Sequence, residues 1–148
     1  MKVLFLDVDG VLNSEDYYVT TPPEKRLSFP LGEFDPAAVK RVNRILDETQ
    51  AKLVVSSSWR WNPGLKNIFE KVGINHEIWG RTPSGKGRNR GYEIQQFLNS
   101  HPEVSNYVIL DDDSDMLEEQ KNNFVHTNTY YGLTDEDTDK AIKILENE

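Results

Sequence analysis

The chain has 148 residues, a formal net charge of −8 at pH 7 and no cysteine. This length is enough for one sizeable hydrophobic core but not two, and the acidic balance argues against broad, sequence-independent binding of nucleic acid. Disulfides, thiolate metal sites and a cysteine nucleophile are excluded. No apolar run approaches the roughly 20 residues that span a bilayer, and the N-terminal run is too short for a signal peptide. We expect one domain over residues 1–148, in the cytoplasm, with no membrane and no obligate protein partner.

Continuous apolar runs predict strands that are buried on both faces. Three runs are strong and one, the last, is weaker: Lys2–Leu6, Lys52–Val55, 107–110 and Phe124–His126. Helical patterns lie between and after them: from Pro36 to Leu46, over 63–72 with Gly73 as the end, over 92–99, and from a capping box of Thr134 and Asp137. Strands that alternate with helices predict an α/β fold. We expect a three-layer, Rossmann-like, doubly wound sheet, mainly parallel, without a large cap domain.

One long irregular stretch, residues 13–34, follows the first predicted strand directly. Loops of this length are usually functional or disordered. Because ligands of parallel α/β sheets bind beyond the carboxyl ends of the strands, we interpret 13–34 as a flap over the functional site.

Each strong strand ends in polar residues. The first ends in Asp7 and Asp9, the second in three serines (56–58), and the third in three aspartates (111–113). These ends share the carboxyl edge of the predicted sheet. Carboxylates gathered there repel one another unless a cation neutralises them, and a magnesium ion, completed by a phosphate oxygen, suits such ligands. The pattern therefore predicts a phosphorylated substrate.

The spacing of Asp7 and Asp9 makes their side chains point the same way on an extended segment. One carboxylate can attack phosphorus while the other serves the leaving group. A serine hydroxyl at the second strand end can donate to the phosphoryl oxygens. Between residues 78 and 92 the chain carries four cations and no acid, so a cation from this segment can offset the negative charge of the transition state.

These motifs, in order, resemble the haloacid-dehalogenase-like (HAD) superfamily. The segments that carry this resemblance, as its first to fourth motifs, are DVDGVLN, VVSSSWR, the basic segment before RGYEI, and YVILDDD. With YGLT they look particularly like the small HAD phosphatase domains of Swiss Army Knife RNA-repair proteins, over nearly the whole chain. The resemblance implies a magnesium-dependent phosphomonoester hydrolase that acts through an aspartyl-phosphate.

Site residues follow from the resemblance position by position. Asp7 is the implied nucleophile and Asp9 the acid and base. Ser56 matches the phosphate-binding hydroxyl, with Ser57 as the alternative if the strand is one residue longer. The implied magnesium ligands are Asp7, the main-chain carbonyl of Asp9, Asp111 and Asp112.

The third motif departs from the family pattern. The family usually places a lysine just before a helix, whereas here Arg90 stands there and Lys86 lies four residues earlier. Arginine is permanently charged and can bind phosphate with two N–H groups, so both residues remain candidates.

The substrate is the least determined part of the sequence interpretation. Trp59 and Arg60 follow the second strand end and are either core residues or contacts to a base or a second phosphate. We expect a nucleotide or a nucleic-acid terminal phosphate, with a sugar or metabolite phosphate as the alternative. A non-catalytic, receiver-like phospho-acceptor domain is a further alternative, although receivers carry their acidic and hydroxyl residues in a different order.

Overall fold

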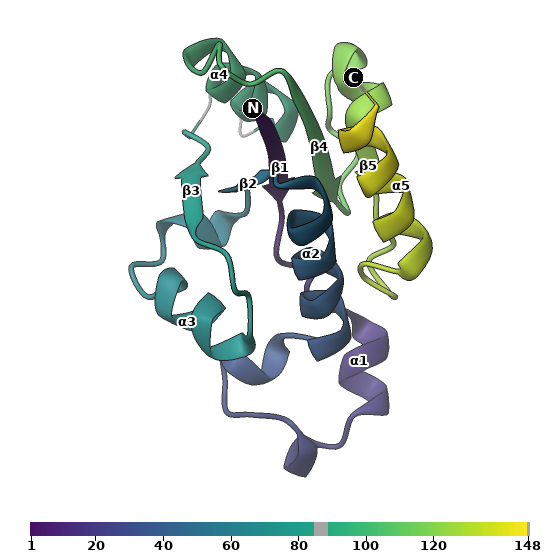
Figure 1. Ribbon diagram of the computed structural model, residues 1–148. Coiled ribbons are helices and arrows are strands. Elements are labelled where there is room, and N and C mark those ends of the chain that lie inside the picture. Colours follow the sequence, from purple (N-terminus) through teal and green to yellow (C-terminus); the bar gives the residue numbers. More distant parts are fainter. Residues whose placement is uncertain (85–88, 148) are drawn as a thin grey trace.

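The computed structural model describes residues 1–84 and 89–147 and shows a five-stranded parallel sheet (Figure 1). The spatial order is β3-β2-β1-β4-β5. The strands are β1 (Lys2–Leu6), β2 (Lys52–Val55), β3 (Ile78–Arg81), β4 (Asn106–Asp111) and β5 (Phe124–His126). The central strand β1 pairs with β2 and β4, so that Leu6 lies beside Val55 and Leu110.

Helices cover both faces of this sheet. One face carries α2 (Pro36–Thr49), α3 (Leu65–Val72) and α5 (Asp135–Glu146), and α2 and α5 lie side by side (Figure 1). The other face carries α4 (Arg90–Ser100). This arrangement confirms the predicted three-layer α/β fold without a large cap domain. Within residues 1–84 and 89–147, no helix combines the length and apolar character that a bilayer-spanning segment requires.

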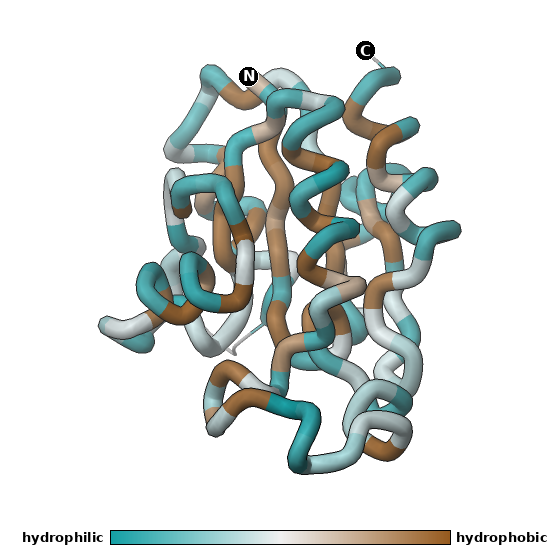
Figure 2. The backbone as a smooth tube through the Cα atoms, turned by 60° about the horizontal axis from the view of Figure 1, so that its bottom comes forward, coloured by the Kyte–Doolittle hydropathy of each residue, from teal (hydrophilic) through white to brown (hydrophobic). Residues whose placement is uncertain are grey.

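The side chains of β1 alternate between two hydrophobic cores, as the pleat of a strand requires. Leu4 and Leu6 pack into the larger core under α2, α3 and α5, while Val3 and Phe5 pack into the smaller core under α4. The ring of Phe5 meets that of Phe97 edge-on, with centroids 5.6 Å apart. Figure 2 shows the result as hydrophobic strands inside more polar helices. Burial on both faces explains why β1, β2 and β4 carry continuous apolar runs.

Predicted helix ends are confirmed at three places. The Asp35 side chain accepts a hydrogen bond from the Ala37 N–H at the start of α2. Thr134 and Asp137 form a reciprocal capping box at the start of α5. Gly73 ends α3 with a φ of 103°, a left-handed conformation that glycine adopts without a steric penalty.

The structure also contains elements that the sequence analysis did not predict. Strand β3 lies inside the segment interpreted only as basic, and α4 begins at Arg90 rather than at residue 92. Residues 13–34 include a short helix, α1 (Glu15–Thr20), and two 3-10 turns, Pro23–Lys25 and Leu31–Glu33. This stretch is therefore partly helical.

The connections place a topological switch point at the carboxyl end of β1. From β1 the chain builds β2 and β3 on one side and then crosses to β4 on the other, so the strand order reverses beside β1. Ligands of doubly wound sheets bind at such a switch point. The hydrogen-bond ladder continues beyond the strands: the Asp7 N–H donates to the Leu110 carbonyl (3.1 Å) and the Ser56 N–H to the Leu6 carbonyl (2.9 Å). These hydrogen bonds therefore fix the backbones of Asp7 and Ser56, the first polar residues after β1 and β2.

Candidate active site

Three aspartates meet at this edge of the sheet. Asp7 follows β1, Asp111 ends β4, and Asp112 comes next. Each offers a carboxylate oxygen, and these oxygens all lie within 4.8 Å of one another. Gly10 permits the close approach: its φ is +80°, and a Cβ atom there would overlap the Asp112 carboxylate. The Thr129 hydroxyl donates to Oδ2 of Asp112 (2.9 Å) and orients it.

Arg90 joins two of these carboxylates. Its Nη1 atom lies 2.6 Å from Oδ2 of Asp111 and 3.3 Å from Oδ1 of Asp7. The side chain extends from the first turn of α4, where the Arg90 N–H donates to the Asp115 carboxylate (2.9 Å). The structure thus brings Arg90 together with Asp7 and Asp111. The other candidate cation, Lys86, lies outside the described residues.

Burial and mutual repulsion disfavour the ionised forms of two of these carboxylates. Burial, with the negative charge of Asp111 second, raises the pKa of Asp7 from 3.8 to about 8, although Arg90 opposes the shift. Burial likewise raises the pKa of Asp111 to about 6, again against the effect of Arg90. Arg90 contacts only two of the three clustered carboxylates, and a divalent cation can neutralise the negative charge that remains when they ionise.

The donor set fits magnesium. Carboxylate oxygens are the ligands that this ion prefers, at about 2.0–2.1 Å, so oxygens on opposite sides of one ion lie roughly 4 Å apart. The oxygens of Asp7, Asp111 and Asp112 lie within 4.8 Å of one another, close enough for one ion to contact all three after small adjustments. The Asp9 carboxylate is not part of this cluster, and a contribution from its main-chain carbonyl stays a prediction.

The two serine candidates differ in their hydrogen bonds. Oγ of Ser57 accepts the Trp59 N–H (3.1 Å) and caps the 3-10 turn Ser58–Trp61. Oγ of Ser56 is fully buried and has no hydrogen-bond partner among the described residues. A buried hydroxyl without a partner is costly, so an oxygen of a bound ligand would satisfy it. This difference favours Ser56 over Ser57 as a phosphate donor.

Asp9 is exposed and its carboxylate is held from two sides. Nδ2 of Asn13 donates to Oδ1 (2.8 Å), and Nε1 of Trp59 donates to Oδ2 (3.2 Å). The side chain of Asn13 is fixed in turn, because its Oδ1 accepts the Gly10 N–H (2.8 Å). The sequence analysis had singled out neither Asn13 nor this role of Trp59.

A scan against protein-family models matches residues 3–138 to the HAD domain in Swiss Army Knife RNA repair proteins. The chain belongs to this family. The match includes residues of all five strands and confirms the resemblance stated from the motifs. Membership in the HAD superfamily supports a hydrolase function. Searches of the curated proteins and of the solved structures found no match.

Arg60 of this HAD domain does not lie where a substrate contact was expected. Its guanidinium is buried and donates to the carbonyls of Thr82 (2.8 Å) and Ser57 (2.9 Å). A third bond, 3.0 Å long, reaches the Glu93 carboxylate. Arg60 therefore ties the end of β2 to the residue after β3 and to α4, and we leave it out of the proposed substrate site.

Glu93 is a functional candidate that the sequence analysis missed. It is buried on α4 between two arginines, with Oε2 bound to Arg60 and Oε1 3.9 Å from Nε of Arg90. Its negative charge offsets that of Arg60 and helps to direct the Arg90 side chain. A glutamate within an otherwise ordinary helical pattern gives no local signal of this placement.

Residues 13–34 of the HAD domain form a closed excursion at the carboxyl end of the sheet, where α1 lies beyond the strands (Figure 1). The Asp35 N–H donates to the Leu12 carbonyl (2.8 Å), which joins the two ends of the excursion. The Asp16 N–H donates to the Tyr130 carbonyl (2.8 Å) and fixes α1 to the loop after β5. That the excursion acts as a flap stays a prediction.

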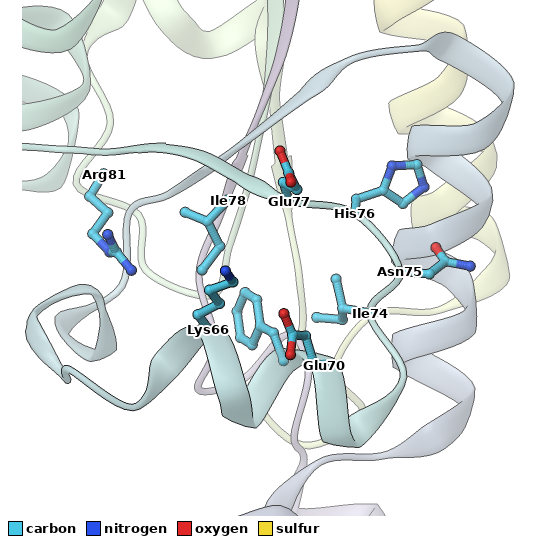
Figure 3. A pocket seen from close by; sticks show the side chains of 9 residues that line it. Lys66, Glu70, Ile74, Asn75, His76, Glu77, Ile78 and Arg81 are labelled. Atoms are coloured by element: carbon cyan, nitrogen blue, oxygen red, sulfur yellow. The ribbon is translucent and has the colours of Figure 1, made fainter.

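A cavity of about 550 Å³ lies between α3 and the segment that leads into β3 (Figure 3). Its walls carry charges of both signs, among them Lys66, Glu70 and Arg81. None of the three clustered aspartates lines it. The cavity is therefore separate from the carboxylate site of this HAD domain.

Proposed function

We propose that this chain is a magnesium-dependent phosphomonoester hydrolase in which Asp7 is the nucleophile. The observation that carries the proposal is the buried Asp7 carboxylate, which lies within reach of a cation, Arg90, and of two further carboxylates, Asp111 and Asp112. A phosphate dianion needs positive charge around it and a nucleophile in line with its leaving group. This cluster can supply both.

In the first step, an oxygen of Asp7 attacks phosphorus and forms a P–O bond, while the bond from phosphorus to the leaving oxygen breaks. Asp9 gives its proton to that oxygen, so the product leaves as an alcohol. Arg90 and the free hydroxyl of Ser56 stabilise the charge that spreads over the phosphoryl oxygens. The enzyme then carries an aspartyl-phosphate on Asp7.

In the second step, the Asp9 carboxylate takes a proton from water while the water oxygen attacks the same phosphorus. The bond between phosphorus and Asp7 breaks, which releases inorganic phosphate and restores both starting carboxyl groups. Asp7, Asp111, Asp112 and the Asp9 carbonyl would hold the magnesium ion. When bound, the ion neutralises the carboxylates and the phosphate oxygens.

For the substrate, we propose a phosphate at the end of a nucleotide or nucleic acid. The family description refers to RNA repair. Two exposed aromatic side chains also lie close to site residues in the sequence: Trp61 follows β2, and Tyr92 stands two residues after Arg90 on α4. Aromatic rings of this kind can stack on bases. The net charge of −8 favours contact with only the terminal phosphate and one or two nucleotides.

A phosphatase screen tests the reaction and the substrate separately. The purified chain is given an aryl phosphate, sugar phosphates, mononucleotides and 3′- or 5′-phosphorylated oligonucleotides, with magnesium or with EDTA. We expect magnesium-dependent turnover, fastest on the nucleotide or oligonucleotide phosphates. Faster hydrolysis of sugar phosphates would support a metabolite phosphatase instead.

The nucleophile is tested by Asp7→Asn, which is nearly isosteric. We expect turnover to fall by several orders of magnitude with the fold unchanged, while Asp113→Asn, at an exposed neighbour, retains activity. Substantial activity of purified Asp7→Asn would refute the mechanism. A stable phosphoprotein without turnover would instead indicate a phospho-acceptor domain.

If the protein contacts only a few phosphates of the nucleic-acid backbone, its binding should have a characteristic dependence on salt. The affinity of the Asp7→Asn protein for a phosphorylated oligonucleotide should depend only weakly on salt, since each phosphate contact steepens that dependence. A steep dependence would indicate an extended interface with the nucleic-acid backbone.

A further inference from the structure

The two hydrogen bonds at Asp9 leave its carboxyl group both fixed and available for proton transfer. Asn13 occupies Oδ1 and Trp59 occupies Oδ2. A carboxylate offers about four lone-pair sites, so two N–H donors leave positions for the proton that Asp9 must carry. Without these donors, an exposed aspartate would rotate about its terminal torsion, which has broad minima.

Trp59 is itself held on several sides. Its backbone N–H is capped by Ser57, and its ring meets the ring of Phe34 edge-on, with centroids 5.5 Å apart at 83°. Phe34 in turn contacts Phe69 of α3, with centroids 6.3 Å apart. The indole therefore has a fixed direction, set by the core, and it points its N–H at Asp9.

We propose that Trp59 is a positioning residue for Asp9, whose indole N–H keeps the acid/base carboxyl aimed at the leaving group. This inference rests on the proposed phosphatase reaction. It also gives the indole a chemical purpose beyond packing, because a phenyl ring could make the same apolar contacts without donating a hydrogen bond. Asn13 performs the matching task at the other oxygen.

The test is Trp59→Phe, which retains an aromatic ring against Phe34 but removes the donor. An alkyl phosphate needs a proton on its leaving oxygen, whereas an aryl phosphate with a stable phenolate does not. General acid catalysis contributes about 10²–10⁴-fold, so misplacing the acid should lower kcat on the alkyl ester by about tenfold or more. We expect kcat on the aryl ester to change by no more than about twofold, since little proton transfer is needed there.

The matched control is Trp79→Phe, the same substitution on β3, where the ring packs on Phe97 and His101. It should leave the ratio of the two kcat values unchanged. Equal losses on both esters in Trp59→Phe would overturn the positioning role while leaving the phosphatase reaction standing. A wild-type protein that hydrolyses neither ester would overturn the proposed reaction, and the positioning role with it.

A second measurement does not depend on activity. The chain has three tryptophans, so its indole N–H resonances can be assigned by the two Phe variants. We expect Asp9→Ala to move the Trp59 indole proton upfield, as loss of a hydrogen bond does, and to leave the Trp79 proton in place. An unmoved Trp59 resonance would show that the contact with Asp9 is not formed in solution and would overturn the inference.

Discussion

Nη1 of Arg90 lies 2.6 Å from Oδ2 of Asp111, closer than it lies to Asp7. The guanidinium thus shares a carboxylate with the proposed metal site. Asp111 is held at its other oxygen as well, where Oδ1 accepts the Asp113 N–H (2.9 Å). Arginine, metal and phosphate would then form one charge-balanced group, in which the position of each depends on Asp111.

The role of Arg90 is tested by two substitutions. Arg90→Gln removes the charge and should lower kcat/KM by about 100-fold or more, the effect of losing one donor that stabilises a transition state. Arg90→Lys retains the charge but not the fork of N–H groups, and we expect an intermediate loss. Arg44→Gln, which breaks exposed ion pairs with Glu48 of α2 and Asp139 of α5, should have no effect. Full activity of Arg90→Gln would show that another cation stabilises the phosphoryl group.

The metal site is tested by the double variant Asp111→Asn, Asp112→Asn. The magnesium concentration for half-maximal activity should rise by about tenfold or more, because loss of ligand charge weakens coordination by oxygen. Titration of activity against magnesium measures this shift. Asp113→Asn is the control, whereas Asp115 is unsuitable because its carboxylate accepts the Arg90 N–H. An unchanged magnesium requirement would show that the two aspartates are not ligands.

Stability of the metal-free protein should depend on pH through Asp7. Its pKa is raised in the folded state from 3.8 to about 8, so the folded state binds the proton more tightly than the unfolded state does. The resulting stabilisation is fully present below pH 3.8 and is lost as pH rises towards 8. We expect Tm in EDTA to fall over this range, at about 2–4 °C per kcal/mol for a chain of this size.

The matched variant for the pH experiment is Asp7→Asn, which cannot ionise and should show a flatter Tm profile. Magnesium should raise the wild-type Tm more at pH 8 than at pH 5, since the ion binds the ionised carboxylate. Parallel profiles of the two proteins would mean that Asp7 does not carry this dependence.

Glu93 should stabilise the fold because it lies between Arg60 and Arg90. Glu93→Gln leaves the buried Arg60 guanidinium without its ionic partner, and breaking such a pair costs about 3 kcal/mol. Urea unfolding measures the loss. Glu70→Gln, at an exposed position on α3, should change the free energy of unfolding by less than about 0.5 kcal/mol. Equal stability of the two variants would contradict the buried ion pair.

The parts of the fold that could be predicted from sequence are those with a continuous or periodic apolar pattern. The buried strands β1, β2 and β4 are such parts. Strand β3 escaped prediction because it is a short edge strand with alternating exposure that contains Gly80 and Arg81. Helix α1 was not predicted because none of its residues is buried. Its sequence therefore lacks the apolar periodicity that indicates a helix.

The same distinction applies to the site. The aspartates at the strand ends could be grouped because parallel strands bring their carboxyl ends to one edge. The roles of Arg60 and Trp59 could not be predicted, because their partners are distant in sequence. Arg60 binds Glu93, and the Trp59 indole binds Asp9, 50 residues away. Such long-range polar contacts follow from the packed fold and leave no local pattern.

The excursion of residues 13–34 leaves and rejoins the fold at one point, where Leu12 and Asp35 share a hydrogen bond. Loops closed in this way tolerate changes of length at a small entropic cost. A different segment could therefore be grafted between Asn13 and Phe34, with these two residues kept because they hold Asp9 and Trp59, while the strand ends stay in place. Relatives could then share the same catalytic residues and differ in their substrates. Exchange of the same segment by protein engineering could likewise change the substrate of this protein.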